Sequence, residues 1–209
     1  MTMILCSPRV YSSQGPIGVI LAGGRGRRIG GAKAGVELGG RPLIRYPLDA
    51  LRSALSEVVI VAKEDTELPP GLGPVPVWVE PPEPCHPLAG IVHALGAAAG
   101  RAVLVCAADM PFVPPALVTR ILTTDPAGAP AVVPTCGGRL QPLLALYLPA
   151  AATALDATAA TAGRPLRDEV AALAPQLIAI EDARAFANVN TRADLRRAEA
   201  ILAYPNVKS

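Results

Sequence analysis

The sequence predicts a three-layer α/β domain, in which a mostly parallel central sheet is covered by helices on both faces. Short, continuous apolar runs of strand length recur along the chain, and helical patterns separate them. Strands that are apolar throughout are typical of parallel sheets buried on both faces. The 209 residues are 51% hydrophobic but only 3% aromatic, so we expect one substantial core made of Val, Leu, Ile and Ala.

The first half of the chain alternates regularly between strands and helices. Apolar runs predict strands at residues 17–22, 57–62, 75–79 and 102–107. Amphipathic patterns predict helices at 42–54, despite Pro47, and at 87–99, which Pro87 opens. The first strand, helix and second strand form a βαβ unit, so we expect parallel strands joined by a right-handed crossover.

The second half is less regular. We expect helices at 114–122, 150–161 and 191–203, the last capped by Thr191, and strands at 131–134, 140–148 and 176–180. The Gly137-Gly138 turn between two of these strands makes the sheet mixed. No linker divides the chain, so residues 16–204 are expected to form a single domain after a flexible extension at 1–15.

Composition excludes several classes of partner. The net charge is only +2 and no face-sized basic cluster occurs, which argues against nucleic acid. No uninterrupted apolar segment approaches the roughly 20 residues that cross a membrane, and the N-terminus lacks the pattern of a signal peptide. The four cysteines show no metal-ligand spacing, and Cys106 is expected to be a buried free thiol. These features favour a cytoplasmic protein.

The stretch LAGGRGRRIGGAK, residues 21–33, directly follows the first predicted strand. Ligands of open parallel sheets bind outside the carboxyl ends of the strands, so this loop is well placed. Its glycines allow main-chain N–H groups to approach an anion closely. Positive charge comes from Arg25, Arg27, Arg28 and Lys33. A polyphosphate is the expected ligand; the alternative is a glycine-rich surface turn whose arginines are merely solvated.

Two familiar phosphate loops do not fit this stretch. A dinucleotide fingerprint needs G-x-G-x-x-G, and Gly30 comes one residue too late. A Walker loop needs Gly-Lys-Ser/Thr, whereas Lys33 lies between Ala32 and Ala34. The loop therefore belongs to another phosphate-binding type.

Asp109 follows the apolar strand predicted at 102–107. An acid at the carboxyl end of a central strand shares the edge of the sheet with the glycine-rich loop, where Mg²⁺ bridging phosphates needs a hard oxygen ligand. The alternative role for Asp109 is that of a helix N-cap before Pro111.

The loop pattern, followed by LGGRPL at 38–43, resembles the signature of sugar- and cofactor-nucleotidyltransferases. The later motifs PLAGI at 87–91, DMPF at 109–112, QPLLALY at 141–147 and FANVNTRADL at 186–195 resemble those of molybdenum cofactor guanylyltransferases. The resemblance covers residues 17 to about 202. It implies a Rossmann-like nucleotidyltransferase fold and transfer of GMP from GTP to the terminal phosphate of molybdopterin, with release of pyrophosphate, to form the guanine dinucleotide cofactor.

The resemblance also implies roles for individual residues. The nucleotide would contact Leu21, Ala22, Gly23, Gly24, Lys33, Glu80 and Asp109. The catalytic residues would be Arg28, Lys33 and Asp109, with Asp109 holding Mg²⁺. The acceptor side would contain Gln141, Arg164, Asn188 and Asn190. No general base is needed, because the attacking phosphate is already an oxyanion; His86 and His93 are expected at the start and on the surface of a helix. Further partners implied are molybdenum-cofactor carrier proteins or target molybdoenzymes.

The chain departs from the family at positions near the nucleotide. Ala32 replaces an acid before the loop lysine, Val61 replaces an asparagine that contacts guanine, and His86 replaces a glycine. Glu80 matches the family's base- or ribose-binding aspartate only across a gap. A cytidylyltransferase for the same cofactor, another nucleotidyltransferase, and a noncatalytic binding relative therefore remain alternatives. Asn188 and Asn190 could instead shape the turn before Thr191, and Arg164 could be a surface residue.

Overall fold

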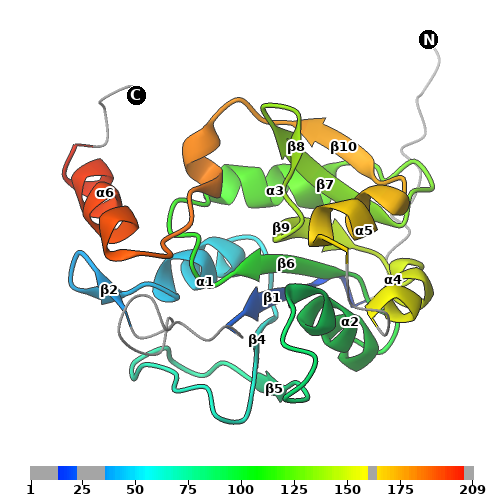
Figure 1. The fold of residues 1–209 in the computed structure, drawn as a ribbon, viewed down its shortest axis with the longest axis horizontal. Coiled ribbons are helices and arrows are strands. Elements are labelled where there is room, and N and C mark those ends of the chain that lie inside the picture. The colour runs from blue at the N-terminus through cyan, green and yellow to red at the C-terminus, as the bar shows by residue number, and fades with distance from the viewer. Residues whose placement is uncertain (1–13, 23–35, 160–163, 205–209) are drawn as a thin grey trace.

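The computed structural model describes residues 14–22, 36–159 and 164–204. It contains an eight-stranded sheet in the order β10-β7-β9-β6-β1-β4-β5, with β8 paired to β7 (Figure 1). Four strands lie parallel to one another: β1 (Ile17–Leu21), β4 (Val58–Ala62), β5 (Val77–Val79) and β6 (Val103–Ala107). A separate pair of strands is formed by β2 (Glu37–Leu38) and β3 (Arg41–Pro42).

The other side of the sheet is mixed. The strand β9 (Leu144–Tyr147) lies antiparallel between β6 and β7 (Ala131–Cys136). The short strand β8 (Arg139–Leu140) forms a hairpin with β7, and β10 (Gln176–Ala179) lies parallel to β7. The predicted mostly parallel, mixed sheet is confirmed.

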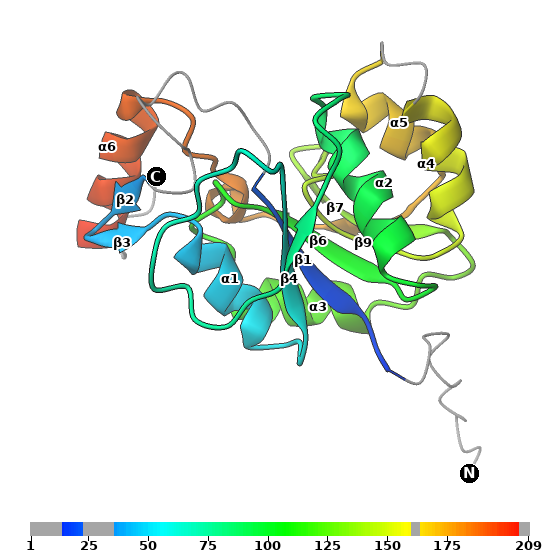
Figure 2. The ribbon, with the colours of Figure 1, turned by 90° about the horizontal axis from the view of Figure 1, so that it is seen from below.

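Helices cover both faces of the sheet, as Figure 2 shows. One face carries α1 (Arg45–Arg52) and α3 (Pro115–Thr123). The other carries α2 (Pro87–Ala97), α4 (Ala151–Ala159) and α5 (Leu166–Ala172). The last helix, α6 (Arg192–Ala203), lies beside the β2–β3 hairpin at one end of the molecule. The predicted three layers are therefore present.

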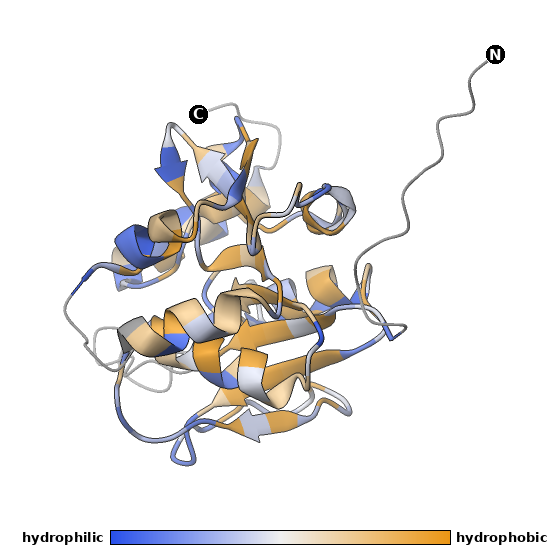
Figure 3. Ribbon diagram, turned by 90° about the vertical axis from the view of Figure 1, so that its right-hand side faces the viewer, coloured by the Kyte–Doolittle hydropathy of each residue, from blue (hydrophilic) through white to orange (hydrophobic). Residues whose placement is uncertain are grey.

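Alternation along the strands divides the core between the two faces. In β1, Ile20 belongs to the cluster under α1 and α3, and Val19 to the cluster under α2 and α4. Both side chains are fully buried, as expected where successive side chains point to opposite faces. Figure 3 shows the apolar colour concentrated on the central strands. The core is aliphatic, as its composition predicted.

Most predicted elements are shifted by a few residues at most, and two differ in a way that has a clear structural cause. The helix expected at 42–54 begins only at Arg45, because residues 41 and 42 pair with 38 and 37 across a turn in which Gly39 and Gly40 have φ of 58° and 74°. The strand expected at 140–148 is broken in two. The N–H of Gln141 donates to Pro134 O at 2.9 Å, after which the chain leaves the edge of β7 and crosses to lie between β6 and β7.

Two short helices were not predicted: α5 and the 3₁₀ helix at Ala183–Phe186. With seven and four residues, they are too short to show a clear helical period. The predicted cap of α6 is confirmed and is a full capping box, in which Thr191 and Asp194 bond reciprocally. The Thr191 hydroxyl is the main cause that lowers the pKa of Asp194 below its ordinary value.

Three smaller features complete the fold. Cys106 is a buried free thiol as predicted, and burial, together with the Asp109 carboxylate, raises its pKa. The Arg101 guanidinium donates to the carbonyls of Gly15 and Gln14 and pairs with Glu57 at 2.5 Å. No helix in the described ranges has the length and apolar character that a membrane crossing requires.

Candidate functional site

The carboxyl ends of the parallel strands are joined by main-chain hydrogen bonds. The N–H of Ala22 donates to Val61 O at 2.9 Å, and the N–H of Ala108 donates to Leu21 O at 3.1 Å. These bonds hold the residues that follow β1 and β6 side by side. The start of the glycine-rich loop and the DMPF motif are therefore neighbours at one edge of the sheet, as the sequence predicted.

Glu80 lies at the same edge, directly after β5, and is only 7% exposed. Its Oε1 is 3.7 Å from Lys63 Nζ, which also donates to Pro81 O at 2.7 Å. A Cβ at Gly90 of α2 would lie 3.2 Å from Glu80 Oε2 and 3.1 Å from Leu21 Cδ2. The absence of a side chain at Gly90 therefore lets α2 approach both residues closely.

Asp109 follows β6 and is 9% exposed. Its main-chain carbonyl accepts a hydrogen bond from the N–H of Val189 at 2.9 Å. Pro114, and not Asp109, is the N-cap of α3, so the alternative role as a helix cap is wrong. Asp109 therefore lies at the carboxyl end of a central strand without capping the helix that follows.

The acidic groups at this edge suit a magnesium ion. Among the residues that the structure describes, no group of three or more His, Cys, Asp or Glu could hold a metal ion by itself. Mg²⁺ commonly takes one or two protein carboxylates and fills its other positions with water and substrate phosphates. A single aspartate beside a predicted phosphate loop fits that ion better than it fits a metal enclosed by protein ligands.

The FANVN segment is brought next to Asp109 from about eighty positions later in the sequence. Asn188 and Asn190, both partly buried, flank the Val189 whose amide binds the Asp109 carbonyl. The main-chain N–H of Asn190 also donates to Asp194 Oδ2 at 3.2 Å, as part of the cap of α6. This capping role uses only the main chain of Asn190 and does not require its amide side chain.

Gln141 and Arg164 lie near the β8–α5 junction. Arg167 Nε of α5 donates to Leu140 O at 3.2 Å, which fixes α5 beside the residue that precedes Gln141. Arg164 is 62% exposed, and its Nε is 3.8 Å from Oε1 of Glu169, which is 6% exposed. Arg164 is therefore more than a solvated surface residue, because it is the cation paired with a buried acid.

Asp109 and Gln141, one from each group of predicted site residues, are connected by a hydrogen bond between the end of β6 and the turn before β9. The N–H of Ala107 donates to Leu143 O at 2.9 Å, which joins the residues before Asp109 to those after Gln141. The structure thus places Leu21, Ala22, Glu80, Asp109, Asn188 and Asn190 at one edge and Gln141 and Arg164 next along it. The predicted residues Gly23, Gly24, Arg28 and Lys33 lie outside the described part of the chain.

The residues that sequence reasoning missed are Lys63, Gly90 as a contact of Glu80, and Glu169. Lys63 directly follows β4, so the rule that found Asp109 also applies to it. Glu169 occupies a core-facing position between the apolar Leu166 and Leu173 of its helix, and an acid in such a position is itself a signal.

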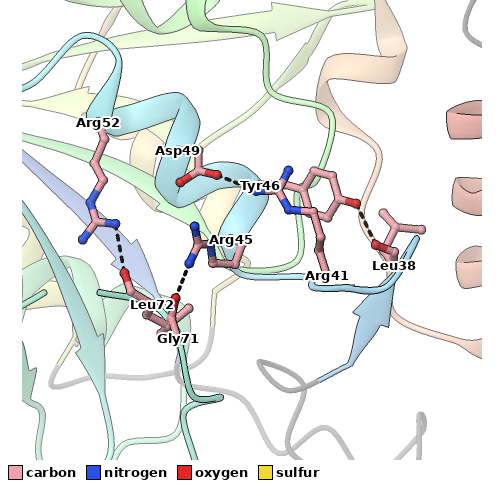
Figure 4. Close-up of polar contacts among 8 residues, drawn as sticks. All are labelled: Leu38, Arg41, Arg45, Tyr46, Asp49, Arg52, Gly71 and Leu72. Carbon is pink, nitrogen blue, oxygen red and sulfur yellow. Dashed lines mark hydrogen bonds and ion pairs between the residues drawn. The ribbon is translucent and has the colours of Figure 1, made fainter. Parts of the chain in front are cut away.

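The β2–β3 hairpin, which follows the glycine-rich loop in sequence, is held firmly against α1 (Figure 4). Arg41 pairs with Asp49 at 2.6 Å and lies over the Tyr46 ring, 4.9 Å from its centre. The Tyr46 hydroxyl donates to Leu38 O at 2.6 Å. Two arginines of α1 also bind carbonyls of the segment before β5: Arg45 at Gly71 and Arg52 at Leu72. These arginines therefore support the fold around the site.

Comparison with known proteins agrees with this arrangement. A model of the MobA-like NTP transferase domain family matches residues 18–177. A molybdenum cofactor guanylyltransferase of Cereibacter sphaeroides is 39% identical over 189 residues, which cover 88% of this chain and 96% of that protein. A probable molybdenum cofactor guanylyltransferase of Pelotomaculum thermopropionicum is 35% identical to this chain, and the match covers 92% of that protein.

The solved structures with the same fold include proteins whose names refer to different nucleotides, guanine in one and cytidine in another. The molybdopterin-guanine dinucleotide biosynthesis protein A of Archaeoglobus fulgidus has a TM-score of 0.70 and 26% identity, with 90% of this chain and 98% of that chain covered. The 2-C-methyl-D-erythritol 4-phosphate cytidylyltransferase of Thermus thermophilus has a TM-score of 0.66 and 26% identity, with 89% and 98% covered. The residues gathered at this edge of the sheet agree with the family model and with the similar proteins, so the chain belongs to the MobA-like NTP transferase family of nucleotidyltransferases.

Proposed function

We propose that the protein transfers GMP from GTP to the terminal phosphate of molybdopterin, forming the guanine dinucleotide cofactor and pyrophosphate. An oxygen of the acceptor phosphate forms a bond to the α-phosphorus of GTP, and the bond from that phosphorus to pyrophosphate breaks. The observation that carries the proposal is the meeting of the end of β1, Asp109 and the Asn188–Asn190 segment at one edge of the sheet. The guanylyltransferases that the chain resembles support the choice of substrates.

On the nucleotide side, the proposed contacts are Leu21, Ala22, Gly23, Gly24, Lys33, Glu80 and Asp109. Glu80 suits guanine because a carboxylate can accept from the adjacent N1–H and N2–H₂ donors of that base. Cytosine offers an acceptor beside its amino group, so it cannot make the same pair of bonds. Because Gly90 has no side chain, this position of α2 places no group against the Glu80 carboxylate.

Asp109 is the proposed ligand of Mg²⁺, and Arg28 and Lys33 are the proposed catalytic cations. A bound divalent metal supplies charge stabilisation to the phosphate oxygens. The two basic side chains add positive charge where negative charge develops on the leaving pyrophosphate. Nucleotidyl transfer mainly requires in-line positioning, so no side chain has to remove a proton from the acceptor phosphate.

The proposed acceptor side consists of Gln141, Arg164, Asn188 and Asn190. Amide groups can donate to and accept from the edge of a pterin, and a guanidinium binds a phosphate with paired donors. Carrier proteins for the cofactor or target molybdoenzymes are proposed as later partners.

A cytidylyltransferase is the second candidate function, because the Thermus thermophilus enzyme shares the fold at the same level of identity. Thermal unfolding with Mg²⁺ and each of GTP, CTP, ATP and UTP separates the two candidates. We expect GTP to raise the melting temperature most, and a larger shift with CTP would favour the second candidate. GTP and molybdopterin should then yield pyrophosphate and the guanine dinucleotide. Binding of GTP without pyrophosphate release would instead identify a noncatalytic relative.

A further inference from the structure

An acid is buried on the apolar side of α5. Leu166, Val170 and Leu173 of this helix and its C-terminus pack into the core under α2 and α4. Glu169 lies between them and is 6% exposed, and its Oε2 has no hydrogen-bond partner in the part of the chain that the structure describes. Burying a carboxylate is costly unless a countercharge compensates it. The position therefore needs a reason beyond packing.

The countercharge is Arg164, and the pair is strongly asymmetric. Arg164 Nε lies 3.8 Å from Glu169 Oε1, and the arginine side chain is 62% exposed while the glutamate is 6% exposed. Across the described ranges, this ion pair is the interaction that Arg164 makes, and it uses only the Nε edge of the guanidinium. The two Nη groups remain available for an oxyanion from outside.

The supporting elements hold this arginine close to the acceptor side. Arg167 donates to Leu140 O, so α5 is attached to the strand that leads into Gln141. Val170 is fully buried, which fixes the turn of helix that carries Glu169. An exposed arginine normally samples many rotamers, and fixing one costs conformational entropy when a ligand binds. A buried carboxylate beside Nε reduces that cost before the ligand arrives.

We propose that Glu169 is a positioning residue, which holds the Nε edge of Arg164 so that its Nη edge faces the terminal phosphate of molybdopterin. This inference rests on the proposed function and adds to it a residue that touches neither substrate. The guanidinium lies between the buried carboxylate and the incoming phosphate and separates two negative groups that would otherwise repel each other. Paired N–H donors on a planar group are the geometry that a phosphate recognises well.

The first test is Glu169→Gln, which keeps the shape of the side chain and removes its charge. The KM for molybdopterin should rise about tenfold. Removing a residue that orients a binding residue commonly weakens binding by about 10- to 100-fold, and this value is at the lower end. The KM for GTP and the kcat at saturating acceptor should stay unchanged, which a general loss of structure would not allow. Asp168→Asn, an exposed neighbour on the same helix, is the matched control and should leave both KM values unchanged.

A double-mutant cycle asks whether Glu169 acts through Arg164. Arg164→Ala should raise the KM for molybdopterin, and adding Glu169→Gln to it should produce no further rise. Arg164→Lys offers a measurement that does not depend on Glu169→Gln folding. It keeps a cation beside Glu169 but lacks the planar fork, so it should also raise the KM for molybdopterin.

The outcomes separate this inference from the proposed function. If the wild-type protein forms no guanine dinucleotide, the proposed function is wrong and the inference falls with it. If the wild type is active but Glu169→Gln leaves the KM for molybdopterin unchanged, only the inference is wrong. An equal effect of Glu169→Gln with and without Arg164 also overturns the inference, and so does a wild-type KM in Arg164→Lys.

Discussion

Two buried glutamates, one on each side of the site, form ion pairs whose cations differ strongly in exposure. Glu80 and Glu169 are 7% and 6% exposed, and each lies slightly less than 4 Å from a basic nitrogen. Their partners differ. Lys63 is itself 14% exposed and donates to the neighbouring carbonyl of Pro81, whereas Arg164 is 62% exposed.

This difference in exposure of the cations matches the ligands proposed for the two sides. At the end of β5 both members of the pair are enclosed by the protein, and the carboxylate lies beside Gly90. On α5 the acid is enclosed, and the cation is the group that meets solvent. A base with N–H donors suits the first arrangement, and a phosphate suits the second. The exposure of the cation, and not the presence of an ion pair, is what distinguishes the two arrangements.

The largest expected effect comes from Asp109, which lies between the two pairs. Asp109→Asn keeps the volume of the side chain but weakens a metal ligand, so kcat should fall by about a hundredfold or more, as when one group that stabilises transition-state charge is lost. Radiolabelled GTP and chromatography of the product would measure it. Asp156→Asn, an exposed acid on α4, is the control and should retain full activity. Normal turnover by Asp109→Asn would remove Asp109 from the metal site.

The energetic contrast between the two glutamates can be measured directly. Glu80→Gln leaves the enclosed Lys63 ammonium without its countercharge and should lower the free energy of unfolding by about 2 kcal/mol. That is below the roughly 3–5 kcal/mol of a fully buried pair, because Lys63 keeps its bond to Pro81.

Glu169→Gln should change the free energy of unfolding by less than about 0.5 kcal/mol, since Arg164 can turn to water and the negative charge buried under α5 is removed. Urea denaturation of the two variants and the wild type under one set of conditions gives the comparison. Equal losses in both variants would show that the exposure of the cation has no energetic consequence.

A third experiment concerns how closely α2 approaches the nucleotide side. In Gly90→Ala, the new methyl group would lie 3.1 Å from Leu21 Cδ2 and 3.2 Å from Glu80 Oε2, so both side chains must move. The KM for GTP should rise several-fold, while the KM for molybdopterin stays the same.

Gly96 in the same helix provides the matched control, because a Cβ there would meet nothing within 4 Å. Gly96→Ala should bind GTP normally and should stabilise the protein by roughly 0.5–1 kcal/mol through helix propensity. Steady-state kinetics and thermal unfolding measure both variants. A rise in the KM for GTP in both would point to the helix backbone instead of the Glu80 contact.

The smallest change expected to depend on pH concerns the cap that follows Asn188 and Asn190. Thr191→Ala should lower the free energy of unfolding by about 1 kcal/mol at neutral pH. The hydrogen bond from Thr191 lowers the pKa of Asp194 below its ordinary value of 3.8. A lowered pKa in the folded state stabilises the protein above pH 3.8, and this contribution disappears as the pH falls through the folded value.

The difference in stability between wild type and Thr191→Ala should therefore shrink as the pH is lowered from neutral to about 3. Denaturation curves at several pH values would show it. Thr119→Ala, at an exposed position of α3, serves as the control and should show no such pH-dependent difference. A constant difference at all pH values would mean that the hydroxyl caps the helix without affecting the Asp194 carboxylate.

The proposed nucleotide side was the more predictable from sequence. Continuous apolar runs indicated β1, β4 and β6 because these strands are buried on both faces, and the rule for parallel strand ends then located Asp109. Glu80 matched only across a gap, and its contacts with Lys63 and Gly90 depend on which strands are neighbours. No local pattern contains that information.

The proposed acceptor side was harder to predict, because its shape depends on pairing between strands that are distant in the sequence. The run from 140 to 148 is apolar throughout, so nothing in it marks where the chain leaves β7 and moves beside β6. The helix α5 has seven residues and follows a proline, which left no clear period to detect. Asn188 and Asn190 were identified by a motif, and their position beside Asp109 rests on one main-chain bond to Val189.

The order of the strands in the sheet also follows the order of the chain. Every strand up to Ala107 lies on one side, as β6-β1-β4-β5, and every strand from Ala131 onward lies on the other, as β9, β7, β10 and the attached β8. The end of the chain then returns to the first side, where Val189 binds the Asp109 carbonyl and α6 packs beside the β2–β3 hairpin. A chimera that exchanges the strands after Ala131 therefore has to keep Val189 and α6 matched to the first half of the chain.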